Sequence, residues 1–195
     1  MHTRETAGAN QDSNHARSWQ QWRRVAWTVA GLALLAPLLA MQFTEEVAWG
    51  VGDFVLFGGM LLLAGAAVET VIRTNPSSIY RYAMGGGLGG AFLLIWVNGA
   101  VGLIGAAGNP ANLMYAGVLA VGVIGALVGR FRARAMSRVL LAMAVIQTVI
   151  MGTAIVMEWG QPSSGPVELV VANGAFAGIW LVSAWLFRKA ERDGT

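Results

Sequence analysis

Long apolar runs alternate with short polar connectors along most of this chain. Each run is close to the ~20 residues that an α-helix needs to cross about 30 Å of hydrocarbon. The six runs are Val25–Phe43, Ala48–Ile72, Ala83–Ala106, Leu113–Gly129, Val139–Met157 and Val167–Phe187. This pattern predicts an all-α fold, a polytopic transmembrane helix bundle with about six spans.

The same pattern divides the chain into three parts. Residues 1–20 are polar and show no apolar period, which is typical of a disordered tail. Residues 21–190 predict a six-helix transmembrane domain, and residues 191–195 a cytoplasmic C-terminal tail. The first run follows Arg23 and Arg24 as in a signal peptide, but it is longer than the ~7–15 residues of a signal-peptide core, so we expect an uncleaved anchor.

Charge predicts the orientation of the spans. All 13 Lys and Arg residues fall on the cytoplasmic side if the N-terminus is inside, and the connectors on the other side contain none. Cytoplasmic connectors are enriched in basic residues, so both termini are predicted to be cytoplasmic. Charged residues make up 12% of the chain, against about 25% in soluble domains. We therefore expect the lipid bilayer as partner, and no nucleic acid despite the net charge of +3.

Several kinds of chemistry are excluded by residue usage. The chain has no cysteine, and its two histidines, His2 and His15, lie in the polar tail. Thiol catalysis, disulfides and a histidine metal site inside the bundle are therefore excluded. Neither an HExxH nor a GxSxG motif is present, and Asp53 is the single aspartate in any apolar run. The sequence predicts a protein that is not an enzyme and that has no metal or cofactor.

Asp53 is the first candidate for an ion- or ligand-binding residue. If Thr44 caps the second helix, Asp53 lies about two turns later, so capping does not explain it. The predicted outer half of the membrane offers it no basic partner, and an unpaired buried carboxylate tends to bind a proton or a cation. The alternative is an aspartate near the interface that bonds to a neighbouring helix or to water.

Four amides are further candidates for the same role. Asn98, Asn112 and Asn173 lie near the predicted outer ends of spans, and Gln147 lies close to the middle of the fifth. A polar path or binding site needs such groups, but amides also join helices by hydrogen bonds. In contrast, Glu69 has an easy partner in Arg73, four residues later on one helix face. The cluster Arg130–Arg138 enforces topology, with anionic lipid headgroups as a secondary ligand.

Glycines recur at four-residue spacing inside the runs. Such pairs place two glycines on one helix face and let helix backbones approach closely, which favours packing inside the bundle or a homo-oligomer. The pairs are Gly85 and Gly89, Gly86 and Gly90, Gly125 and Gly129, and Gly174 and Gly178.

Three stretches lie at or near the predicted outer face: Met41–Val47 with Asp53-Phe54, Trp96–Gly105, and Asn109–Tyr115. Together they resemble a family of small bacterial multi-pass inner-membrane proteins. The resemblance covers roughly residues 30–150 and implies an inner-membrane location, without a reaction or a substrate.

Two functions remain open from the sequence. The first is a small transporter or ion-binding protein with an outer-facing polar site near Asp53, Asn98 and Asn112. The second is a non-catalytic subunit or assembly factor in a heteromeric membrane complex, packed through the glycine-rich helix faces.

Overall fold

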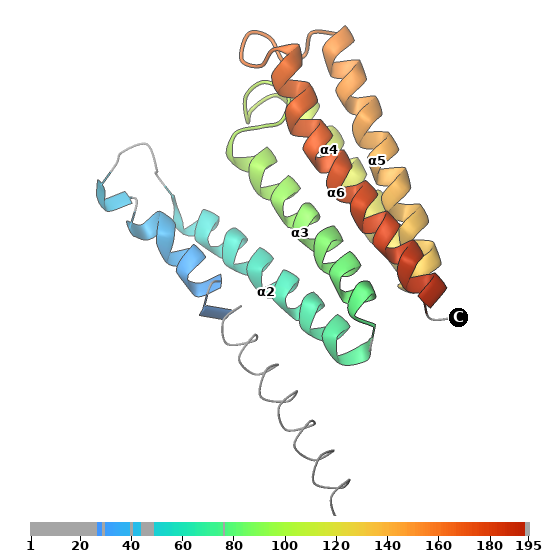
Figure 1. Ribbon diagram of the computed structural model, residues 1–195. Helices are drawn as coiled ribbons and strands as arrows, with labels where there is room; N and C mark the ends of the chain where they lie inside the picture. Colours follow the sequence, from blue (N-terminus) through green and yellow to red (C-terminus); the bar gives the residue numbers. More distant parts are fainter. Residues whose placement is uncertain (1–26, 29, 40, 44–48, 76, 194–195) are drawn as a thin grey trace, which may run out of the picture. The chain divides into compact units, whose positions relative to one another are not determined.

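The computed structural model describes residues 27–28, 30–39, 41–43, 49–75 and 77–193 (Figure 1). Within these ranges all regular structure is helical, which confirms the predicted all-α class. The elements after the first apolar helix are α2 (Val51–Thr74), α3 (Ser78–Ala100), the short 3-10 helix η1 (Pro110–Leu113), α4 (Met114–Val128), α5 (Ala133–Val156) and α6 (Pro166–Asp193).

Five segments in the described part of the chain are long and apolar enough to cross a membrane. Four are α2, α3, α5 and α6, and the fifth joins η1 to α4 over Pro110–Val128. A shorter apolar helix, Ala30–Phe43, precedes them. The chain is therefore a multi-pass helical membrane protein, whereas the predicted total of about six spans and the cytoplasmic termini stay predictions.

The helix ends differ from the ends of the apolar runs. α3 begins at Ser78 and α5 at Ala133, each at least five residues before the start of its apolar run. Hydropathy marks only the part of a helix that suits hydrocarbon, and polar turns extend the helix beyond it. α3 also ends earlier than expected, at Ala100, because Gly102 has a φ of +78° and turns the chain out of the helix.

The chain divides into two compact units within α2, after Gly65. In the first unit, the helix Ala30–Phe43 packs against α2. A methyl group added at Gly58 would lie 3.4 Å from Leu34 Cδ1, and one at Gly65 would lie 2.9 Å from the Trp27 ring. The rings of Phe54 and Phe57 meet Trp49 edge to face near the start of α2. The helix Ala30–Phe43 and the first part of α2 therefore pack side by side.

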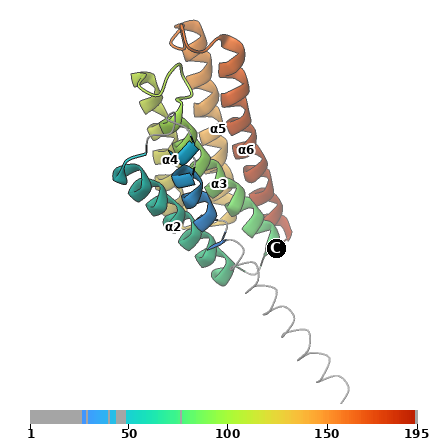
Figure 2. The same ribbon diagram turned by 90° about the vertical axis from the view of Figure 1, so that its left-hand side faces the viewer.

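The second unit begins at Ala66 and contains the end of α2 together with a bundle of α3, α4, α5 and α6 (Figures 1 and 2). α6 packs against both α3 and α5, and α5 also packs against α4. Its core includes the fully buried Trp180 and Phe187 on α6 and Leu94 on α3. The loops from α3 to α4 and from α5 to α6 lie at one end of this bundle, which we call the loop end, and the last turn of α6 lies at the other (Figure 1).

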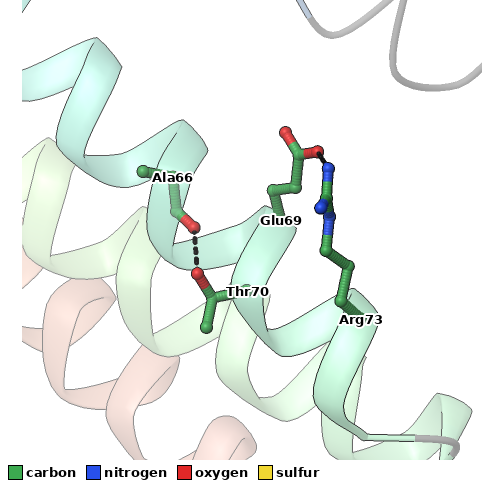
Figure 3. Close-up of polar contacts among 4 residues, drawn as sticks. All are labelled: Ala66, Glu69, Thr70 and Arg73. Atoms are coloured by element: carbon green, nitrogen blue, oxygen red, sulfur yellow. Dashed lines mark hydrogen bonds and ion pairs between the residues drawn. The ribbon is translucent and has the colours of Figure 1, made fainter.

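The predicted pair of Glu69 and Arg73 is present in α2 (Figure 3). The Arg73 guanidinium donates to the Glu69 carboxylate across one helical turn. Thr70 on the same turn donates its hydroxyl to the carbonyl of Ala66 at 2.8 Å. These residues therefore bond within their own helix, as the sequence predicts for Glu69.

Candidate functional site

Three buried polar side chains meet between α4, α5 and α6, and we call them the polar centre: Tyr115, Gln147 and Asn173. Tyr115 donates its hydroxyl to Asn173 Oδ1 at 2.6 Å, and Gln147 Nε2 donates to the same oxygen at 3.0 Å. Gln147 and Asn173 have no exposed surface, and Tyr115 is 1% exposed. A single amide oxygen on α6 therefore joins three helices.

Helix geometry fixes the position of Asn173. Its Nδ2 donates to the carbonyl of Leu169, one turn earlier in α6, at 3.0 Å. This bond turns Asn173 Oδ1 toward the two donors from α4 and α5, since the two polar atoms of an amide point apart. The Asn173 amide is thereby held on both sides by the protein.

One atom of the polar centre has no partner in the described part of the chain. Gln147 Oε1 is buried and accepts no hydrogen bond, and the Trp180 indole Nε1, also buried on α6, donates none. Water does not reach the inside of a membrane bundle freely, so an unpaired acceptor there is costly. A small species with a donor group, or a cation, would satisfy this oxygen.

Asn112 shapes the loop that follows α3. Its Oδ1 accepts from the backbone N–H groups of Leu103 and Ile104 at 3.1 and 2.9 Å. Its Nδ2 donates to the carbonyls of Ile104 and Ala106 at 3.3 and 2.9 Å. The side chain is only 4% exposed, and both of its polar atoms are hydrogen-bonded to backbone groups. Asn112 therefore acts as a structural centre for this loop.

Asn98 lies beside Asn112 but is less well bonded. Its Nδ2 donates to the backbone carbonyl of Asn112 at 3.2 Å, and its buried Oδ1 accepts from no described residue. The neighbouring loop is tied down as well, since Asn109 Nδ2 donates to the carbonyl of Trp159 at 2.7 Å. The two loops at the loop end are thus joined by a hydrogen bond from the Asn109 side-chain amide.

Asp53 lies in the first turn of α2, so the expectation that capping does not explain it is wrong. Its Oδ2 accepts from the backbone N–H of Gly50, just before the helix, at 2.8 Å. Glu168 makes the equivalent bond to Gly165 at the start of α6. An acid three residues after the cap position satisfies a helix-start N–H in this way. Thr44, the predicted cap, lies outside the described residues.

The structure brings some of the predicted site residues together. Gln147 bonds directly to Asn173, and Asn98 to Asn112, whereas Asp53 belongs to the first unit. Tyr115 was missed as a site residue, although it ends one of the stretches that carry the family resemblance. A tyrosine within an apolar helix is a usable signal, because its hydroxyl needs a partner when buried.

The predicted packing glycines fall into two groups. Methyl groups added at Gly125 and Gly129 would come within 2.5 Å of Val139 and 2.6 Å of Ala135, so α4 meets the start of α5 closely there. Four others have no described atom within 4 Å of such a methyl group, apart from their own helix and chain neighbours: Gly85, Gly89, Gly174 and Gly178. On α3 the close contacts to α6 are made instead by Gly86 and Gly90.

Among the residues that the structure describes, no group of three His, Cys, Asp or Glu side chains could hold a metal ion. Comparison of the chain with protein-family models, curated proteins and solved structures finds no match.

Proposed function

We propose that this chain is a small transport-type or ion-binding protein of the bacterial inner membrane, and that its ligand binds at the polar centre. The transport hypothesis from the sequence is kept, but the proposed site lies at Gln147 and Asn173 instead of near Asp53, Asn98 and Asn112. The observation that carries it is the buried Gln147 Oε1, an acceptor without a partner at the meeting point of three helices. No reaction is proposed, because the polar centre contains no acid, base or activated nucleophile.

The chemistry of the polar centre limits the ligand. Tyr115, Gln147 and Asn173 are uncharged, so they offer oxygen acceptors without a counter-charge for a multivalent ion. A small species with N–H or O–H donors fits the free oxygen of Gln147, and ammonium is the simplest charged example. Ammonium and potassium are therefore the probes with which we would test transport.

The test is ion flux into liposomes that contain the full-length protein. The Gln147→Leu variant removes the free acceptor, and we expect its ammonium or potassium flux to fall at least tenfold, on the order of 1.4 kcal/mol in binding. Thr148→Val is the matched control, because Thr148 donates to the carbonyl of Ala144 within its own helix at 2.9 Å. Equal flux from Gln147→Leu and wild type, or no flux above empty liposomes, would refute the proposal.

The second candidate is a non-catalytic membrane subunit or assembly factor, or a homo-oligomer. It is favoured by one glycine pair on α3 and one on α6, at which an added methyl group would meet no described atom within 4 Å apart from chain neighbours and the helix's own backbone. Glycine pairs let a further transmembrane helix approach closely. Purification from native membranes in mild detergent tests it. A stable complex that is lost in both Gly89→Leu and Gly178→Leu, together with the absence of flux, would favour this role over transport.

A further inference from the structure

A pocket with a volume of about 180 Å³ lies between the start of α5 and the end of α6, in the second unit. A single water needs only about 10–15 Å³ of such space, so the pocket accommodates a ligand of many atoms. Its wall is made by six residues: Arg134, Ser137, Arg138, Arg188, Glu191 and Arg192. We call it the arginine pocket.

The charge of the arginine pocket is strongly unbalanced. The wall contains four arginines and one glutamate, so its formal net charge is +3. Arg134 and Arg138 are four residues apart on α5, and Arg188 and Arg192 are four apart on α6. Like charges at this spacing repel each other along a helix. Glu191 lies 3.5 Å from the Arg134 guanidinium and is the only acid of the wall.

A buried hydroxyl in the wall provides independent evidence for a ligand. Ser137 is 1% exposed, and its Oγ has no hydrogen-bond partner among the described residues. A serine in a helix usually bonds to a carbonyl one turn earlier, and a buried hydroxyl without a partner is costly. A ligand in the arginine pocket would supply the missing bond.

The start of α5 adds to the attraction for an anion. Its first turn contains no acidic residue, and its cap residue Arg132 makes no side-chain bond to the helix. The unpaired N–H groups of a helix start carry partial positive charge and favour anions. Guanidinium groups and a hydroxyl donor beside the first turn of α5 match a phosphoryl group, which accepts several hydrogen bonds at once.

We propose that the arginine pocket binds the phosphoryl group of an anionic ligand, and that glycerophospholipid headgroups are its main source. The pocket lies at the end of the bundle that the charge distribution assigns to the cytoplasmic leaflet, where anionic lipids attract basic segments. This proposal stands independently of transport at the polar centre.

Binding of three small ligands to the detergent-solubilised full-length protein tests the proposal by calorimetry. They are short-chain phosphatidylglycerol, short-chain phosphatidylcholine and inorganic phosphate. We expect phosphatidylglycerol to bind about tenfold more tightly than phosphatidylcholine. If inorganic phosphate binds and phosphatidylglycerol does not, the arginine pocket is still a phosphoryl site, but its ligand is a soluble phosphate compound and not a lipid. If neither binds more tightly than phosphatidylcholine, the proposal is wrong.

Four variants locate the binding. Arg138→Gln on α5 and Arg188→Gln on α6 should each weaken binding of the anionic ligand about tenfold, and Ser137→Ala severalfold. Arg132→Gln is the matched control, because Arg132 carries the same charge immediately before α5 but does not line the pocket. An equal loss in Arg132→Gln and Arg138→Gln would indicate diffuse attraction and would overturn the assigned site. Because Arg138 and Arg188 lie on different helices, misfolding of one variant leaves the other as a test.

Discussion

At the scale of single residues, Asn112 and Asn98 differ in how far the protein uses their amides. Asn112→Ala removes the partners of two buried N–H groups and two carbonyls. We expect it to lower the free energy of unfolding by about 3 kcal/mol, because unpaired buried groups are costly. Asn98→Ala removes one bond together with an unpaired oxygen, so its loss should be below about 1 kcal/mol. Thermal unfolding of the two variants in detergent gives the comparison. Equal losses of stability would contradict the structural role assigned to Asn112.

Gly102 permits the turn that ends α3. A methyl group there would lie 2.6 Å from the carbonyl of Ala106 and 2.7 Å from Asn112 Nδ2, at a φ of +78°. Gly102→Ala should therefore destabilise the protein by about 1–3 kcal/mol. The helical Gly99 has no described neighbour within 4 Å, and Gly99→Ala should be neutral or slightly stabilising. Unfolding temperatures of the two variants give the comparison, and a stable Gly102→Ala protein would refute the strained turn.

The role of a residue near a helix end can be predicted from the sequence only if the position of that helix end is known. Asp53 was interpreted as an unpaired acid because its helix was expected to be capped by Thr44 and therefore to begin at Glu45, whereas α2 begins at Val51. The later start places Asp53 in the first turn, where its carboxylate accepts a hydrogen bond from the Gly50 N–H. The ion pair of Glu69 could be predicted without knowing the helix ends, since its partner Arg73 lies four residues later on the same helix face.

At the scale of helices, neighbouring glycines on α3 have different surroundings. A methyl group at Gly90 would lie 2.7 Å from Ile179 Cγ2 and 2.8 Å from the Trp180 ring, so Gly90→Ala should push α3 away from α6. We expect a loss of about 1–3 kcal/mol from such overpacking. Gly89→Ala is the control, since its methyl group meets no described atom, and it should cost nothing. A similar unfolding temperature for both variants would contradict this packing.

It is harder to predict which face of a helix packs against a neighbour than to predict the helix itself. Four-residue spacing is equally good for Gly85 with Gly89 and for Gly86 with Gly90, and the sequence alone does not say which pair faces a neighbour. The polar centre has the same difficulty. Gln147 and Asn173 are recognisable as polar groups in apolar helices, but their bond, and the contribution of Tyr115, depend on how three helices pack.

For the whole molecule, the all-α multi-pass architecture follows from hydropathy because each span must satisfy its own backbone hydrogen bonds in lipid. The orientation is predicted from charge alone, and this prediction can be tested directly by cysteine labelling because the chain has no cysteine of its own. In intact cells, a membrane-impermeant maleimide should label Ser163→Cys, in the connector between α5 and α6. Asn75→Cys, between α2 and α3, should react only after the membrane is opened. The reverse result would invert the topology.

The hydrogen bonds that the Leu103 and Ile104 N–H groups donate to Asn112 Oδ1 have a consequence for hydrogen exchange. Amides in a connecting loop normally exchange with deuterium quickly, because they open to water without cooperative unfolding. The amides of Leu103 and Ile104 are instead held by a buried side chain at 3.1 and 2.9 Å. They should therefore exchange as slowly as helical amides in the intact protein. In Asn112→Ala the same two amides should become fast, which makes this loop a local reporter of whether the loop end of the bundle is closed.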